Sequence, residues 1–326
     1  MERGIPGELG SSEKRLMMDS PRWSVVITTR NRAQMLKRAI ESCVSQTVPC
    51  DIFVIDEAST DATPDIVKRF PQVTYIRNPK PLGHCASANR GIQASRTEWV
   101  KPLDDDDWLS PNCIEVMTEA LARARSTGLN PTLISGSAAN VDVDGREISR
   151  TRSPSNVPVG LRSRQLLSLM MLDQAPLGTP VQVGHSREIA LKVGGWNELR
   201  TADHHQHGDE AELWVKLAAE GDAVFIPDLV GYRTMWPGGS QKIIPHEERF
   251  RSNLSLKDEI AGHLGSDRPK DIENYLALHW AIVAAKEKKY GPAFKLGLKW
   301  FRRPMSFRKV LNRRSFKDAK PLVVPF

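Results

Sequence analysis

Short apolar runs alternate with helix-patterned segments in the N-terminal third of the chain, and this alternation is the strongest constraint on the fold. Runs rich in valine and isoleucine predict strands at residues 24–28, 51–56, 73–76 and 98–103. The intervening segments predict helices at residues 35–44, from a hydroxyl cap at Thr63 onward, and at 83–96. Strands and helices that alternate in this way form parallel β-α-β units. The sequence therefore predicts an α/β fold with a mostly parallel central sheet flanked by helices.

Polar residues follow three of these predicted strands at the points where the strands end. They are residues 28–32, the pair Asp56 and Glu57, and the acidic run at 104–107. In an open parallel sheet, ligands bind beyond the carboxyl ends of the strands. We therefore expect these three groups to meet at one edge of the sheet and to form a single site.

The acidic run places four aspartates in succession, from Asp104 to Asp107, directly after an apolar strand. Carboxylates this close repel one another unless a positive charge lies among them. Mn²⁺ or Mg²⁺ meets that need, because hard divalent cations take carboxylate ligands and can bridge the diphosphate of a bound nucleotide. The alternative is a solvated acidic loop, in which Asp107 caps a helix that starts near Pro111.

Composition and charge limit the classes of partner. The net charge of +7 favours anionic partners such as nucleotides, acidic lipids or nucleic acid, and no nucleic-acid motif is recognised. The four cysteines form no C-x-x-C pair, which indicates reduced thiols in a cytoplasmic protein. Residues 1–21 lack the apolar core of a signal peptide, and no apolar run is long enough to predict a membrane span.

The rest of the chain predicts a hairpin at residues 141–148 that turns on an Asp-Gly pair, a helix at 210–220, and helices from about residue 243. We therefore divide the chain into a flexible tail at 1–21, a catalytic domain at 22–240 and a helical region at 241–326. Residues 294–316 interleave aromatic and basic residues. Such a segment fits either contact with an anionic membrane, on the inner face of the plasma membrane, or a solvated helix.

Several motifs between residues 24 and 235 resemble those of family 2 glycosyltransferases, in the same order and spacing. They lie at residues 25–32, 54–61, 76–78 with 82–83 and 89–92, 103–108 with 111, and 208–214. The resemblance implies a GT-A fold and an inverting enzyme that transfers a sugar from a UDP- or dTDP-sugar donor. The implied acceptor is a hydroxyl of a glycan or a lipid-linked molecule, in the synthesis of cell-envelope polysaccharide.

The resemblance also implies roles for individual residues on the donor side. Thr29, Arg30 and Asp56 would contact the nucleoside, since a carboxylate can accept the imide N–H of uracil or thymine. Asp104 would face the ribose or the diphosphate and Asp106 would hold the metal. The remaining nucleotide-binding candidates are Arg77, Asn89 and Asp105.

On the acceptor side, Glu210 falls where the family places its catalytic base, which takes the proton of the attacking hydroxyl. Its neighbour Asp209 is the alternative base. Trp196 and Trp236 are candidates for stacking on acceptor sugar rings, because indole packs well against an apolar ring face; core packing is the alternative for each. Gly238–Ser240 is either a loop that closes over the donor or a plain connector.

The chain departs from the family pattern at four places. Glu57 stands where a second aspartate is common, Glu210 follows Asp209, Ala88 replaces an arginine, and Thr234 follows Arg233 where relatives carry a histidine. The missing histidine implies fewer protein ligands for the metal.

Two rival functions remain, a catalytically inactive nucleotide- or glycan-binding relative and a sugar nucleotidyltransferase, although the loop after the first strand lacks the glycines of the latter. The histidines at 203–207 predict a polar loop near the acceptor, with metal ligation as the alternative.

Overall fold

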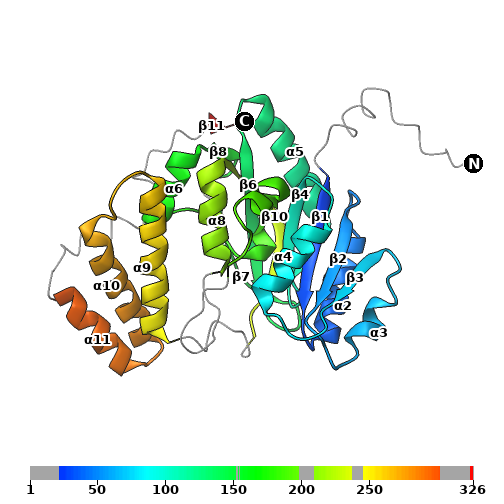
Figure 1. Ribbon diagram of the computed structural model, residues 1–326, viewed down its shortest axis with the longest axis horizontal. Coiled ribbons are helices and arrows are strands. Elements are labelled where there is room, and N and C mark those ends of the chain that lie inside the picture. Colours follow the sequence, from blue (N-terminus) through cyan, green and yellow to red (C-terminus); the bar gives the residue numbers. More distant parts are fainter. Residues whose placement is uncertain are drawn as a thin grey trace, which may run out of the picture.

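A computed structural model describes residues 22–197 except 152 and 154, together with residues 209–236, 245–301 and 324–325. Its described strands form one sheet, drawn in Figure 1. They are β1 (Trp23–Thr29), β2 (Asp51–Asp56), β3 (Val73–Arg77), β4 (Trp99–Asp104), β5 (Trp108–Leu109), β6 (Pro131–Val141), β7 (Glu147–Arg150), β8 (Val159–Leu161), β9 (Val183–Ser186), β10 (Asp222–Thr234) and β11 (Val324–Pro325).

The order across the sheet is β11-β8-β10-β6-β9-β4-β1-β2-β3, with β5 added to β10 and β7 added to β6. Strands β4, β1, β2 and β3 are mutually parallel, and β6 is parallel to β10. The short β9 joins the two parallel groups by pairing antiparallel with both β4 and β6. The predicted mostly parallel sheet is therefore confirmed, with an antiparallel strand at its centre and others at its margins.

The described helices follow the strands in sequence. They are α2 (Ala33–Val44), α3 (Thr63–Val67), α4 (His84–Ala94), α5 (Cys113–Ser126), α6 (Ser163–Met171), α7 (Arg187–Lys192), α8 (Asp209–Glu220), α9 (His246–His263), α10 (Lys270–Lys286) and α11 (Tyr290–Phe301), with one 3₁₀ turn at Pro180–Gln182. The predicted hydroxyl cap of α3 is wrong. Thr63 lies inside the helix, and the carboxylate of Asp61 accepts the N–H of Thr63 instead, at 3.0 Å.

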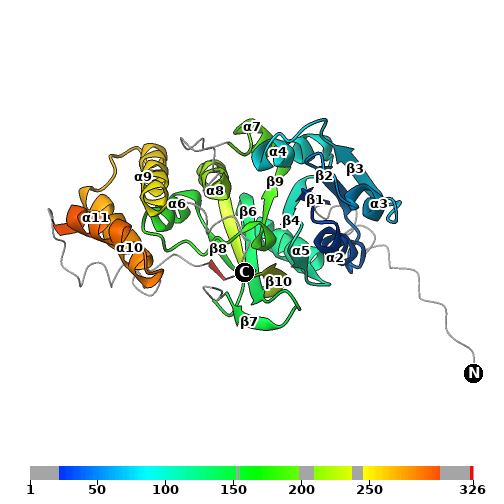
Figure 2. The same cartoon turned by 90° about the horizontal axis from the view of Figure 1, so that it is seen from below.

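Helices cover both faces of the sheet, as Figure 2 shows for α4 on one side and α2 and α5 on the other. Alternate residues of β1 point to opposite faces, so Val25 and Ile27 pack with α2 and α5 while Val26 packs with α4. Gly91 lets α4 lie very close to the sheet. A Cβ at this position would lie 2.2 Å from Cγ1 of Val26 and 3.3 Å from Cγ1 of Ile55, closer than atoms in contact allow.

The three helices α9, α10 and α11 confirm the predicted helical appendage and lie at the left of Figure 1. Phe250 of α9 and Leu276 of α10 belong to the same apolar core as α6 and α8, so the helices share a core with the sheet. No helix among the described residues is long and apolar enough to cross a membrane. After the helices, β11 pairs with β8, which the sequence pattern does not predict.

Candidate active site

The carboxyl ends of β1, β2 and β4 meet at one edge of the sheet. Thr29 pairs in register with Asp56, and Thr28 pairs with Asp104. The loops that follow β1 and β2 are joined as well: the amide oxygen of Asn31 accepts the N–H of Thr60 at 2.7 Å. The prediction that the polar groups after these three strands gather at one edge is confirmed.

The acidic run brings three carboxylates together in a tight turn. Asp104, Asp106 and Asp107 each offer an oxygen atom, and these atoms all lie within 4.8 Å of one another. Hard carboxylate oxygens at this spacing fit Mg²⁺ or Mn²⁺. Asp107 does not cap the next helix, whose N-cap is Asn112; its carboxylate accepts the N–H of Thr234 on β10 at 2.8 Å.

Electrostatic strain in the run is evident at Asp104 and Asp107. Burial raises the pKa of the Asp104 carboxyl to about 6; nearby His84 opposes the shift, whereas Asp106, Asp105 and Glu210 add to it. Burial also raises the pKa of Asp107, again reinforced by Asp104 and Asp106. Stabilising all of these carboxylates in their charged form therefore requires additional positive charge at this edge.

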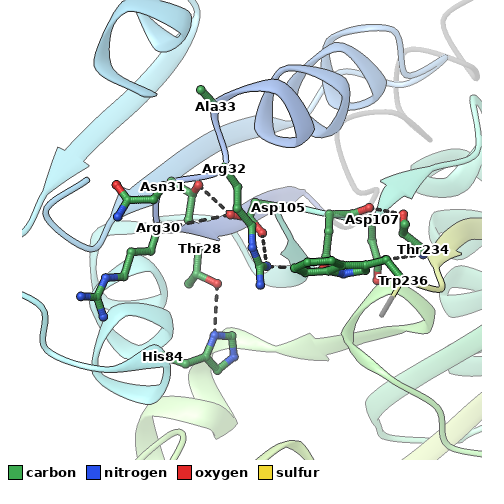
Figure 3. A network of polar contacts seen from close by, with 12 residues as sticks. Thr28, Arg30, Asn31, Arg32, Ala33, His84, Asp105, Asp107, Thr234 and Trp236 are labelled. Carbon is green, nitrogen blue, oxygen red and sulfur yellow. Dashed lines mark hydrogen bonds and ion pairs between the residues drawn. The ribbon is translucent and has the colours of Figure 1, made fainter. Parts of the chain in front are cut away.

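Two arginines, Arg32 at the N-cap of α2 and Arg38 within this helix, supply part of that charge, and Figure 3 shows Arg32 between the carboxylates and an indole ring. Arg32 contacts Asp105 at 2.8 Å and Asp106 at 3.3 Å. Partial burial lowers the pKa of Arg32, but the charges of these carboxylates outweigh that effect, so the pKa is raised overall. Arg38 donates to the main-chain oxygen of Asp106 at 3.2 Å and lies 3.7 Å from the ring centre of Trp108.

A buried lysine lies inside the sheet near the run. The ammonium of Lys101 donates to the carbonyl oxygens of Pro180, at 2.7 Å, and Pro102, at 3.2 Å. Burial lowers the pKa of Lys101 to about 8, against the opposing charges of Asp107 and Asp104. At neutral pH this lysine remains charged, and it adds a fixed positive charge behind the acidic run.

Asp105 points back into the protein rather than towards an open site. Its carboxylate is buried and accepts the hydroxyl of Thr29 at 2.7 Å, as well as the guanidinium of Arg32. The side chain of Arg30 extends away from this network in Figure 3. Among these residues proposed for nucleotide binding, Thr29 and Asp105 are hydrogen-bonded to one another. Arg30 is exposed to solvent.

Trp236 contacts the acidic run through its indole N–H and contacts Arg32 through its ring face. Its indole N–H donates to the carboxylate of Asp106 at 2.9 Å, and the guanidinium of Arg32 lies 5.0 Å from its ring centre. A tryptophan in this position orients a metal-ligand candidate. This contact adds a role to the acceptor stacking that the sequence suggested for Trp236.

Asp56 is buried and fully engaged inside the protein. One oxygen accepts the N–H of Ser59 at 2.8 Å, and the other accepts the hydroxyl of Tyr75 at 2.5 Å and lies 3.5 Å from Arg77. Because its side chain has no exposed surface, a nucleobase would reach it only after Tyr75 or Arg77 moved. Arg77 is half exposed and is the member of this group that a ligand meets first.

Glu57, the neighbour of Asp56, organises the loop that leads into α4. Its carboxylate accepts the amide of Asn78 at 3.0 Å, the N–H groups of Leu82 at 3.2 Å and Gly83 at 2.9 Å, and the hydroxyl of Ser87. The extra methylene relative to aspartate lets the carboxylate reach this loop. Glu57 is therefore a structural residue of the site edge.

Asn89 and Trp196 form one unit behind the site. The side-chain amide of Asn89 donates to the carbonyl of Trp196 at 2.8 Å and accepts its N–H at 2.9 Å. The Trp196 ring is buried and packs edge-on against His84 and Trp214, at centroid distances of 5.4 and 5.7 Å. Core packing, the alternative considered for Trp196, describes its surroundings, and Asn89 contacts the main chain of this turn.

A small cavity runs from Asp104 inward between α4 and the sheet. Besides Asp104, its polar lining comprises Thr28, His84, His185 and Trp196, and the remaining lining residues are apolar. Thr28 and His84 are hydrogen-bonded at 3.2 Å at the mouth. His185 is fully buried, and that burial lowers its pKa to about 4, so its ring is neutral at pH 7.

Glu210 lies in the first turn of α8, and its charge is among those that raise the pKa of Asp104. The two carboxylates therefore face the same region, although they are far apart in the sequence. The backbone of Asp209 begins the same helix. The histidines at 203–207 and the segment Gly238–Ser240 lie outside the described residues, and so does most of the basic stretch after residue 301.

The sequence expected Glu57 at this edge as part of a polar pair, but it gave no individual role to several other residues found there: Arg32, Arg38, His84 and Lys101. A signal existed for two of them. Arg32 belongs to the polar cluster after the first strand, and Lys101 interrupts an apolar strand just before the acidic run. For the others, the partners come from loops distant in sequence, which local pattern does not reveal.

Comparison with known proteins agrees with this fold and edge. The family model described as Glycosyl transferase family 2 matches residues 24–168, which include β1 to β4 and the acidic run. The matched residues therefore include the strand ends at which the polar groups of this edge meet. Over these residues the chain is similar to family 2 glycosyltransferases, and it is also similar to curated relatives and to solved structures.

Among curated relatives, the succinoglycan biosynthesis protein ExoO of Rhizobium meliloti is 34% identical over 134 residues, covering 39% of this chain and 36% of that protein. The putative colanic acid biosynthesis glycosyl transferase WcaA of Escherichia coli is 32% identical over 105 residues, 31% of this chain and 38% of that protein. The chain thus spans little more than a third of the length of these relatives.

Among solved structures, TarS of S. aureus in complex with UDP-GlcNAc superimposes with a TM-score of 0.57 at 16% identity, over 79% of this chain and 71% of that one. A further structure of the same TarS segment gives a TM-score of 0.55 at 15% identity, over 79% of this chain and 70% of that one. The similarity confirms the predicted GT-A fold.

Proposed function

We propose that this chain transfers a sugar from a nucleoside-diphosphate sugar to a hydroxyl group, with inversion at the anomeric carbon. The observation that carries the proposal is the group Asp104, Asp106 and Asp107, whose oxygens lie within 4.8 Å at the carboxyl end of β4. Glu210 lies near enough for its charge to act on Asp104. A diphosphate site and a carboxylate base are the two parts that such a transfer needs.

The donor in this proposal carries uracil or thymine, and TarS, which shares the fold, is described in complexes with UDP-GlcNAc and with UDP. Arg77 and Arg30 reach the open side of the nucleoside edge, and Asp56 holds Arg77 in place. An arginine is well suited to a phosphate or to the carbonyl groups of a pyrimidine, since it presents several donors in a plane.

A divalent cation, Mn²⁺ or Mg²⁺, would be held by Asp104 and Asp106, with Asp107 as a further carboxylate. When bound, it neutralises the charge of the departing nucleoside diphosphate. Three side chains support this position. Arg32 and Trp236 donate to the Asp106 carboxylate, and the buried Lys101 lies in β4, shortly before the acidic run.

The proposed base is Glu210, with Asp209 as the alternative. A base here takes the proton from the acceptor hydroxyl as its oxygen bonds to the anomeric carbon and the nucleoside diphosphate leaves. The acceptor is a glycan or a lipid-linked molecule in the synthesis of a surface polysaccharide. The names of ExoO and WcaA, which refer to succinoglycan and colanic acid biosynthesis, support this part. We place the enzyme in the cytoplasm, at the inner face of the membrane.

The experiment is a donor screen with UDP-, dTDP- and GDP-sugars and Mn²⁺, in which released nucleoside diphosphate is measured. We expect release from a UDP- or dTDP-sugar, and we expect Glu210→Gln to lower transfer by about 10²–10⁴-fold while donor binding is retained. Asp209→Asn is the matched variant. If Asp209→Asn is inactive and Glu210→Gln is active, the base is Asp209. Tight nucleotide binding without release from any donor supports an inactive binding relative instead.

A further inference from the structure

Helix α11 carries an exposed apolar stripe. Tyr290, Phe294 and Leu298 are 70%, 68% and 46% exposed, and they follow one another at four-residue intervals. Residues at this spacing lie on one face of a helix. Large apolar side chains grouped in this way on a helix face mark a surface that contacts something less polar than water.

The opposite face of α11 packs inward. Leu296 is buried and Trp300 packs against the shared core of the helices. Helix α11 therefore has a packed inner face, and the exposed stripe does not result from loose packing of the helix. Within this helix Trp300 therefore faces the core, while Tyr290 and Leu298 face outward.

Positive charge surrounds the stripe. Four exposed lysines lie on α11 or in the turn before it, at positions Lys288, Lys289, Lys295 and Lys299, and the exposed Lys286 ends α10. Lys295 is paired with Glu247 at 3.3 Å and Lys299 lies 4.8 Å from the ring of Phe250, so these two lysines contact α9 at the edge of the stripe. Aromatic and aliphatic side chains flanked by lysines suit the interface between lipid headgroups and acyl chains.

Charge also argues against the other occupants. A second copy that docked by the same face would bring lysines against lysines. The sequence at 302–323 contains eight lysines and arginines and one acidic residue, so that segment would add like charge to this face. An anionic lipid surface complements both the lysines and the apolar stripe.

We infer that the face of α11 defined by Tyr290, Phe294 and Leu298 docks on an anionic membrane surface, with the neighbouring lysines facing the lipid headgroups. This inference goes beyond the proposed sugar transfer, because it concerns a surface separate from the acidic run. It places the enzyme at a membrane surface through α11, and so deepens the proposal of a lipid-linked acceptor.

The test is flotation of the full chain with vesicles of phosphatidylcholine alone or with about a third phosphatidylglycerol. We expect binding only to the anionic vesicles, and weaker binding at high salt. Replacing Tyr290, Phe294 and Leu298 together by serine should lower the partition coefficient by about tenfold or more. Lys288→Gln with Lys289→Gln should weaken binding most at low salt.

The matched control replaces Val143 and Ile148, exposed apolar residues elsewhere, by serine. This control should bind as the unaltered chain does, and thermal unfolding should report an unchanged fold for every variant; Phe294→Glu alone replaces the triple variant if that one unfolds. Failure of the unaltered chain to bind, or equal binding by the triple variant, overturns the inference. So does a change of oligomeric state in the triple variant without an effect on vesicle binding. Donor hydrolysis, measured without vesicles, tests the sugar transfer separately.

Discussion

Two groups of carboxylates lie at the same edge of the sheet and have opposite surroundings. Asp56 and Glu57, after β2, accept hydrogen bonds from hydroxyl, amide and main-chain N–H groups on nearby loops. In the acidic run after β4, burial and mutual repulsion raise the pKa of Asp104 to about 6 and that of Asp107 well above its usual range. One group is satisfied by the protein, and the other is left short of positive charge.

The difference distinguishes carboxylates that stabilise the fold from carboxylates that are candidates for chemistry at the same edge. Charged groups that the fold satisfies hold loops in place, so their loss costs stability. Charged groups that the fold leaves strained cost stability while they remain, and such strain is a feature of functional sites. The comparison can be tested by removing one carboxylate from each group.

The largest effect is expected from Asp104→Asn, because it removes a carboxylate of the metal-binding candidates. We expect Mn²⁺-dependent transfer to fall by about 10³-fold, a loss similar to that of a charge-stabilising group in other enzymes. Transfer at saturating donor and Mn²⁺ measures this. An exposed variant, Asp144→Asn, is the control and should keep full activity.

The same variant should gain stability at neutral pH. A carboxyl whose pKa is raised on folding costs stability once pH exceeds its unfolded value, and the full cost is present above its folded pKa, here about 6. The free energy of unfolding of Asp104→Asn should therefore be about 1–3 kcal/mol larger than that of the unaltered chain at pH 7, and about the same at pH 4. Urea unfolding at the two pH values measures this, and lower stability at pH 7 would contradict the comparison.

Glu57→Gln tests the satisfied group. The substitution places an NH₂ group against donors that now point at a carboxylate, so buried donors lose their acceptor. We expect a loss of about 2–4 kcal/mol in the free energy of unfolding. Glu119→Gln, on the exposed face of α5, is the matched control with little effect expected. A stable Glu57→Gln protein with lost donor binding would instead make Glu57 a ligand-binding residue.

The smallest effect is expected from Trp236→Phe, which keeps an aromatic ring beside Arg32 but removes the indole N–H that Asp106 accepts. Losing a partner that orients a metal ligand typically lowers metal affinity, and we expect about a tenfold weaker Mn²⁺ affinity. Titration calorimetry with Mn²⁺ and UDP measures it. Unchanged affinity would mean that Asp106 does not depend on this bond.

Local pattern was sufficient to predict the half of the sheet that carries the site. Strands β1, β2 and β4 are apolar runs next to helices, so their parallel order and shared carboxyl edge follow from sequence. The two longest strands, β6 and β10, were not predicted. β6 contains Gly136 among serine and alanine, and β10 contains Pro227 at an irregular part of its pairing, so neither has the apolar alternation of a typical strand.

Within the site, proximity along the chain was predictable and proximity in space was not. The grouping of Asp104 with Asp106 follows from their spacing. The engagement of Asp106 by Trp236 and of Glu57 by Gly83 depends on loops brought together by the fold. Single-residue roles that rest on such contacts therefore required the structure.

The close approach of α4 to the sheet has a consequence for directed evolution. Gly91 lies outside the site, yet the absence of a side chain there sets how near α4, and with it His84, comes to β1. A larger residue at this position requires Val26, Ile55 or α4 itself to shift. Libraries limited to site-lining positions would leave the spacing of α4 and β1 unsampled, and position 91 offers a way to vary that spacing without altering any charged residue of the site.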